Sequence, residues 1–125
     1  MTEPQTLSTR TLPSPIVEYI EASNSFDGER LAAAFADDAM VNDARREFWG
    51  VRAIKSWSDK EIIGDKVTMD VTEAKEHYGD IIVDALMDGE FDKTGLPDEL
   101  ILTHYFRVQG DKIVSLIIIR NVPGE

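Results

Sequence analysis

The stretch LILTHYFRVQGDKIVSLIIIRNV, residues 100–122, decides the fold. Two runs rich in apolar and β-branched residues, 100–109 and 112–122, are separated by Gly110-Asp111, and such a pair between two apolar runs is typical of a β-hairpin. Side chains alternate along a strand, so the first run predicts one nearly apolar face made of Leu100, Leu102, His104, Phe106 and Val108. His104 is the only strongly polar residue on this face. It is therefore either a core histidine or part of a pocket.

The second run, 112–122, is apolar on both faces. Alternation predicts Ile113, Ile117 and Ile119 on one side and Val114, Leu116 and Ile118 on the other. A strand with two apolar faces needs a cover on each of them. Helices would cover one face, and we predict that a second copy of the chain covers the other, giving a homodimer through the outer sheet face.

The upstream sequence supplies more strands and the helices. Two further β-rich blocks, 66–78 and 80–91, precede a turn-rich loop at 92–98. Before them, apolar residues at helical spacing predict helices from about Pro15 with Ser14 as its cap, over 27–36, and over 50–62, with a short strand at 39–43. Helices come first and long strands later, which predicts an α+β fold with a mixed or mainly antiparallel sheet.

The composition sets limits on the function. The chain has 125 residues, enough for one domain, and a formal charge of −11 from 24 acidic and 13 basic residues. This acidity argues against nucleic acid and anionic membranes as partners. Cysteine is absent, which excludes disulfides and thiolate chemistry. The two histidines lack zinc-ligand spacing, so we expect neither a metal nor a cofactor.

The first residues differ from the rest of the sequence. Residues 1–13 are rich in Thr, Ser and Pro, which predicts a flexible N-terminal arm before a single domain at 14–125. The arm has no basic region followed by an apolar one, so no secretion signal is predicted, and no apolar run is long enough for a membrane span. We therefore expect a cytoplasmic location.

Three segments together resemble a known group of proteins. The block FADDAMVND, 35–43, follows a helix that contains Tyr19, a glycine-led helix follows at 50–57, and the chain continues to HYFRVQGDKIVSLIII, 104–119. In this order they are similar to the nuclear transport factor 2-like superfamily, which includes SnoaL-like polyketide cyclases and ketosteroid isomerases. The resemblance implies a cone-shaped, strongly curved sheet packed on three N-terminal-half helices, a cystatin-like fold.

The resemblance also implies a site. Ketosteroid isomerases carry a tyrosine on the first helix, an aspartate base after the FADDA-like block, and a second acid on a late strand. Tyr19 and Asp43 match the first two, and His104 stands where the second acid would be. A neutral acid donates a hydrogen bond to the enolate oxygen in such isomerases, whereas a histidine differs in reach and pKa. The ligand-binding residues that we expect around this site are Trp57, Phe35, Phe106 and Leu102.

Each candidate also has a structural interpretation. Asp43 fits a turn that caps the next segment, and Asn42-Asp43 is a common turn pair. Tyr19 fits core packing, with its hydroxyl bonded to the backbone. Asp43 and His104 also fit a hydrogen-bonded pair in which one orients the other. Asp84 and Trp49 are weaker candidates for the pocket.

Two functions follow from these observations. The first is a cofactor-independent isomerase, cyclase or dehydratase for a hydrophobic carbonyl compound, in which Asp43 moves a proton while Tyr19 and His104 stabilise negative charge. The second is a non-catalytic module that binds a small apolar ligand or a partner. Convergence of Asp43, Tyr19 and His104 on one open cavity would favour the first function.

Overall fold

The structure is a computed structural model that describes residues 5–7 and 11–120. The helical elements are α1 (Ser14–Asn24), α2 (Gly28–Ala33), α3 (Val51–Ser58) and a π-helical turn, η2 (Asp59–Ile63). The strands are β1 (Gln5–Leu7), β2 (Phe35–Asp43), β3 (Arg46–Trp49), β4 (Thr68–His77), β5 (Asp80–Asp88), β6 (Leu100–Gln109) and β7 (Lys112–Arg120).

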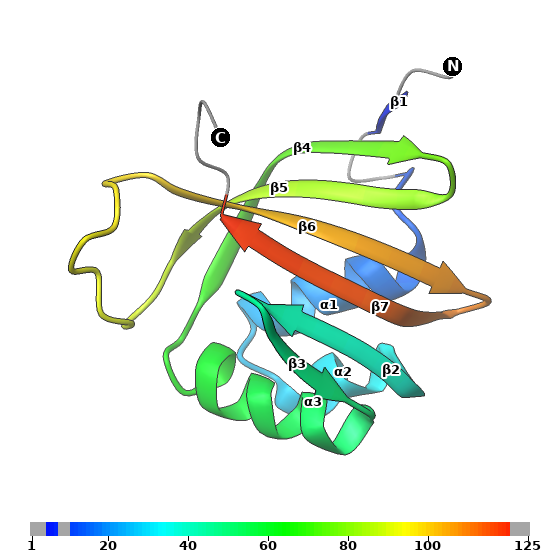
Figure 1. The fold of residues 1–125 in the computed structure, drawn as a ribbon, viewed down its shortest axis with the longest axis horizontal. Helices are drawn as coiled ribbons and strands as arrows, with labels where there is room; N and C mark the ends of the chain where they lie inside the picture. The colour runs from blue at the N-terminus through cyan, green and yellow to red at the C-terminus, as the bar shows by residue number, and fades with distance from the viewer. Residues whose placement is uncertain (1–4, 8–10, 121–125) are drawn as a thin grey trace.

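The strands form one mixed sheet in the order β1-β4-β5-β6-β7-β2-β3. All neighbours are antiparallel except β2 and β7, which run parallel and place Asp43 beside Ile118. The long strands β4 to β7 cross the molecule, and α1, α2 and α3 lie together along one side of the sheet (Figure 1). The predicted α+β fold, with a curved, mainly antiparallel sheet on N-terminal-half helices, is confirmed.

The first two helices show how local sequence sets their ends. Helix α1 begins at Ser14 itself, with Pro13 at the N-cap and no side-chain cap, so the prediction that Ser14 caps the helix is wrong. Helix α2 begins after Asp27, whose side chain accepts a hydrogen bond from the Arg30 amide at 3.1 Å, as N-cap residues do. This helix ends at Ala33, three residues before the predicted end.

The strand β2 is longer than the sequence suggests because tertiary pairing overrides helix propensity. Alanine favours helices, and the alanine-rich run before Asp37 therefore predicts one. In the structure Phe35 already pairs with Ile113 of β7, so the strand begins at Phe35 and not at Ala39.

Helix α3 continues directly into the π-helical turn η2, and the two form one side of the molecule. Gly50 caps α3 with a φ of 88°, in the left-handed region that glycine adopts readily, and its amide donates to the Ala39 carbonyl at 2.8 Å. The helix then continues into η2, where each amide reaches one residue further back. The predicted helix over 50–62 is therefore present, with its last turn widened.

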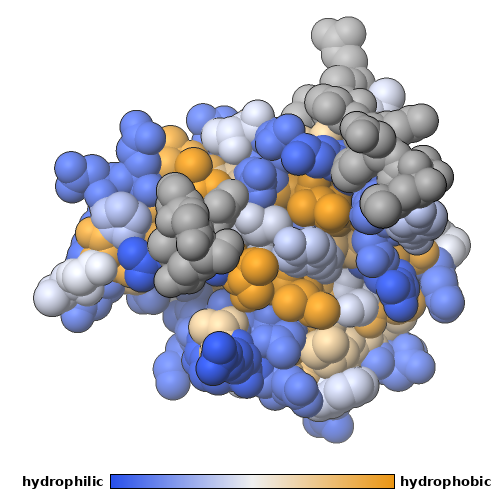
Figure 2. All heavy atoms as spheres, turned by 45° about the horizontal axis from the view of Figure 1, so that its top comes forward, coloured by the Kyte–Doolittle hydropathy of each residue, from blue (hydrophilic) through white to orange (hydrophobic). Residues whose placement is uncertain are grey.

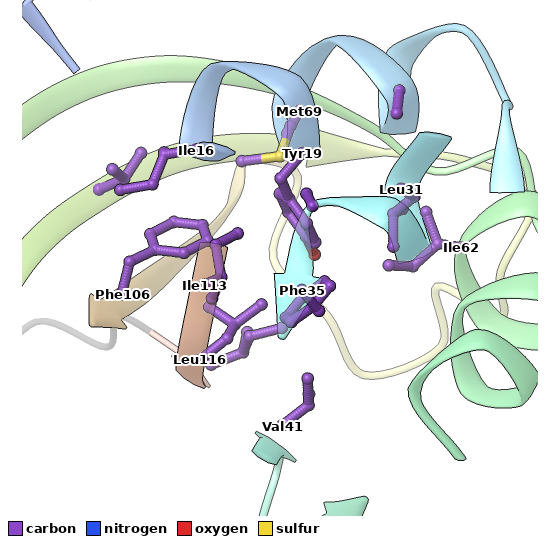
Figure 3. Close-up of a cluster of buried hydrophobic side chains, with 14 of the residues drawn as sticks. Ile16, Tyr19, Leu31, Phe35, Val41, Ile62, Met69, Phe106, Ile113 and Leu116 are labelled. Atoms are coloured by element: carbon purple, nitrogen blue, oxygen red, sulfur yellow. The ribbon is translucent and has the colours of Figure 1, made fainter. Parts of the chain in front are cut away.

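The core lies between the helices and the inner face of the sheet. Tyr19 extends from α1 into the middle of this core (Figure 3), edge-on to Phe35 at 5.9 Å and to Phe106 at 5.5 Å between ring centroids. Ile16, Leu31, Ile54 and Leu116 are fully buried in the same core cluster. This packing fixes α1 on the sheet and so fixes the position of Tyr19.

The outer face of the last strands keeps exposed apolar residues. Ile117 and Ile119 are 36% and 46% exposed, whereas Ile113 is fully buried. The β6–β7 register shifts between Arg107 and Val108, and this bulge moves Ile113 to the inner face, contrary to simple alternation. In Figure 2 hydrophobic residues on the visible face form patches separated by hydrophilic ones.

Parts of the two chain ends can be compared with prediction. In the predicted arm, residues 5–7 pair with β4 as β1, and Leu12 is buried. The rest of the arm at 1–4 and 8–10, and the predicted strand end at Val122, lie outside the described residues. None of the helices in the described part of the chain is long and apolar enough to cross a membrane.

Candidate functional site

A cavity of about 200 Å³ opens between the inner face of the sheet, α1, η2 and the β5–β6 loop. Its lining is mostly apolar, with a few polar groups from different elements, as is usual for small-molecule sites. The lining residues are Tyr19, Ser23, Asp43, Trp57, Glu61, Ile62, Asp65, Val67, Met69, Met87, Phe91, Leu96, Leu100, Leu102, His104 and Ile118.

Helix α1 contributes Tyr19 and Ser23, which are one helical turn apart and therefore share a face. Burial, and secondarily the negative charge of Asp43, raise the pKa of the Tyr19 phenol well above its usual value. The Tyr19 hydroxyl therefore stays protonated at neutral pH. It has no hydrogen-bond partner within the described part of the chain, so it remains available as a donor at the cavity wall.

Asp43 lies at the end of β2, at the start of a tight turn to β3. Ala44 and Arg45 form the centre of this turn with φ of 53° and 70°, left-handed values that are uncommon for residues other than glycine. Such backbone strain is often found at functional sites. The Asp43 side chain is 23% exposed and lines the cavity.

The two carboxylate oxygens of Asp43 have different surroundings. Oδ2 accepts hydrogen bonds from Trp57 Nε1 at 3.1 Å and from Arg46 Nη2 at 3.0 Å. Oδ1 has no partner among residues 11–120. Trp57 and Arg46 therefore hold the carboxylate in place through one oxygen and leave the other able to accept a proton.

Arg46 links Asp43 to Glu61, another residue of the cavity lining. Its guanidinium forms a forked pair with Glu61 of η2, Nη1–Oε2 at 2.9 Å and Nη2–Oε1 at 2.6 Å. Forked arginine–carboxylate pairs are geometrically specific and stronger than single contacts. Through Arg46, the β2–β3 turn and η2 are joined beside the cavity.

His104 is 1% exposed on the inner face of β6, stacked on Phe106 with ring centroids 6.0 Å apart. Its Nδ1 lies 3.3 Å from the Val83 carbonyl oxygen of β5. Burial lowers the pKa of the imidazole to about 4, and the nearby carbonyls of Val83 and Leu102 offset only part of this effect. The ring is therefore neutral at pH 7.

Several predicted site residues come together at this cavity. Tyr19, Asp43 and His104 line it from α1, β2 and β6, together with Trp57 and Leu102. Phe35 and Phe106 do not line it, because they pack behind Tyr19 in the core.

Two weaker candidates lie elsewhere. Asp84 accepts a hydrogen bond from Thr103 on the other face of the sheet, and Trp49 is 65% exposed. Within residues 11–120, Asp43 and His104 do not bond to each other, and no three acidic or histidine side chains form a metal site.

Sequence reasoning missed Ser23 and the charged residues in and beside the cavity lining. Ser23 could have been found from its spacing to Tyr19, since residues four apart on a helix lie on the same face. Arg46, Glu61 and Asp65 carry no such local signal: Arg46 and Glu61 are 15 residues apart and meet only because η2 folds against the β2–β3 turn.

No protein-family model and no curated protein sequence matches the chain. Solved structures do resemble it. A protein from Sinorhizobium meliloti with the provisional name polyketide cyclase has 25% identity and a TM-score of 0.79, over 90% of this chain and 100% of that one.

Two further structures share the fold. A ketosteroid isomerase-like protein from Catenulispora acidiphila, solved in complex with trimethylamine, has 20% identity and a TM-score of 0.71, over 87% of this chain and 86% of that one. A computationally designed 17-OHP binder has 18% identity and a TM-score of 0.70, over 86% and 90%. The chain therefore has the fold of the nuclear transport factor 2-like superfamily, as its sequence predicts.

Proposed function

We propose that the cavity is a cofactor-independent acid–base site that forms an enolate from a small hydrophobic carbonyl compound. One observation carries this proposal: Tyr19, Asp43 and His104 line the same cavity from three separate elements. Apolar walls would hold the carbon skeleton, while a donor and a base face the same space.

The roles follow from the free atoms. Asp43 Oδ1 removes a proton from the carbon next to the carbonyl group, and the Tyr19 hydroxyl donates a hydrogen bond to the developing enolate oxygen. The enolate is then reprotonated at another carbon, attacks a second carbonyl or expels a β-hydroxyl group, which are isomerisation, cyclisation and dehydration. We assign enolate stabilisation to Tyr19 alone, because a neutral His104 that donates through Nδ1 to Val83 presents a lone pair.

Hydrogen–deuterium exchange tests the proton-transfer step without knowledge of the natural substrate. The α-protons of 2-tetralone, a bicyclic ketone, are followed by NMR in D₂O with and without the protein. Asp43→Asn should lower protein-catalysed exchange by about 100-fold or more, since general base catalysis contributes that much. Asp38→Asn is the matched control, because Asp38 lies exposed on the same strand. Equal exchange in the wild type and in Asp43→Asn would refute the role of Asp43.

A second function, ligand binding without turnover, is favoured by the surroundings of Asp43. Arg46 and Trp57 both donate hydrogen bonds to the Asp43 carboxylate, so one of its two oxygens is already held in a structural contact. The designed 17-OHP binder has the same fold. Binding of 2-tetralone without any protein-dependent exchange would establish this second function and exclude the first.

We further propose that two copies of the chain associate through the outer face of β6 and β7. Ile117 and Ile119 are exposed there, and a groove of about 110 Å³ beside them is lined by Tyr105, Arg107 and Ser115 among others. Light scattering after size exclusion tests this: Ile117→Glu with Ile119→Glu should halve the mass, and Thr94→Glu in the exposed β5–β6 loop should not. A monomeric wild type at about 100 µM would refute it.

A further inference from the structure

The hydrogen bond at Nδ1 determines what His104 offers to a ligand. A carbonyl oxygen only accepts, so the 3.3 Å contact with Val83 requires the proton to be on Nδ1. In a neutral imidazole the other nitrogen then carries a lone pair. Nε2 is thus a hydrogen-bond acceptor, and His104 is one of the residues that line the cavity.

No hydrogen-bond donor in the described part of the chain reaches this acceptor. The His104 side chain is 1% exposed, and no described residue donates a hydrogen bond to Nε2. Among the described residues no fully enclosed side-chain nitrogen or oxygen lacks a hydrogen-bond partner, so Nε2, which has none, must be accessible from the cavity. A bound ligand can supply that donor, because His104 is one of the residues that line the cavity.

The charges around the cavity limit the form of the donor. Asp43, Glu61 and Asp65 line it, and Arg46, the cation bonded there, is already shared between Asp43 and Glu61. Three carboxylates and one guanidinium leave a negative balance, which disfavours a phenolate or a carboxylate beside them. A neutral O–H group avoids that repulsion.

We propose that the ligand of this cavity carries an un-ionised hydroxyl group that donates a hydrogen bond to Nε2 of His104. The inference deepens the proposed function and rests on it, since it uses the same cavity. With Tyr19 as donor to a carbonyl oxygen and His104 as acceptor from a hydroxyl, the substrate class becomes a hydrophobic hydroxy-carbonyl compound. His104 is then a specificity-determining residue.

A pair of probes in which a methyl group replaces the donated proton tests this inference. 2-Naphthol and 2-methoxynaphthalene share the ring system, and both oxygens can accept a hydrogen bond from Tyr19, but only the naphthol can donate. We expect calorimetric titration at pH 7 to show about tenfold tighter binding of 2-naphthol, the size of one net hydrogen bond.

Two variants assign the preference to its residue. His104→Phe keeps an aromatic ring against Phe106 and should reduce the preference to less than about threefold. Tyr19→Phe should weaken both probes alike and keep the preference. If the preference persists in His104→Phe, the acceptor is Asp43 and not His104, and the inference is overturned.

A measurement on the wild type alone guards against misfolding of the variants. The ¹⁵N resonance of His104 Nε2 should move toward the hydrogen-bonded value with 2-naphthol and remain in place with 2-methoxynaphthalene. Equal affinity for the two probes, or an unmoved resonance, would overturn the inference and leave the proposed function standing. Binding of neither probe would refute the cavity as a site for such ligands, and with it both proposals.

Discussion

Acidification should destabilise this protein through protonation of His104. The His104 imidazole has a pKa of 6.5 in the unfolded chain and about 4 in the folded one. Between these pH values the unfolded chain binds a proton and the folded chain does not. Above pH 6.5 His104 has no effect on the free energy of unfolding. Below pH 6.5 that free energy falls as the pH drops toward 4. The full effect is about 3 kcal/mol, of which about 2 kcal/mol is lost between pH 7 and pH 5.

Urea denaturation followed by tryptophan fluorescence measures this loss directly. Wild type should lose about 2 kcal/mol more than His104→Phe between pH 7 and pH 5, since the variant has no imidazole to protonate. His77→Gln removes the other histidine, whose ring packs at a tilt against Tyr78 and does not line the cavity, and should behave as wild type. The reasoning fails if wild type and His104→Phe show the same pH dependence, or if wild type gains stability on acidification.

Three further substitutions follow from single contacts. Asn24→Ala should cost about 2 kcal/mol in urea denaturation, because it removes two hydrogen bonds to the Met69 backbone, of 3.0 and 2.8 Å; an unchanged midpoint would contradict this. Arg45→Gly should raise the free energy of unfolding by up to about 1 kcal/mol, because glycine adopts its φ of 70° without strain; a loss would show that the turn is unstrained. Tyr19→Phe should change stability by less than about 0.5 kcal/mol, since the hydroxyl has no partner among the described residues, and a larger loss would reveal one.

The strand pattern allowed much of the site to be predicted. Alternation along β6 placed Leu102 and His104 on the inner face, and both line the cavity. Helical spacing placed Tyr19 on the inner side of α1, where it is 2% exposed. These predictions depend only on the local period of side chains, which tertiary contacts left intact.

The errors have tertiary causes. Phe35 was expected on a helix beside the ligand, but pairing with Ile113 draws it into β2 and into the core. A bulge in β7 reverses the face of Ile113, and a bulge leaves no clear mark in the sequence. The proton on Nδ1 of His104 is set by the Val83 carbonyl, a backbone group whose position no side-chain pattern reveals.

The parallel pairing of β2 with β7 has a consequence for synthesis of the protein. Asp43 lies beside Ile118, so the strand that carries the candidate base pairs with a strand 75 residues later in the chain. Contacts of such long sequence separation slow folding, because the entropy of loop closure must be overcome before they form. On the ribosome, residues 112–120 must emerge before Asp43 has its wall of the cavity, and every earlier nascent chain holds an open, apolar half-site. Chaperone dependence should therefore be greatest just before β7 is complete.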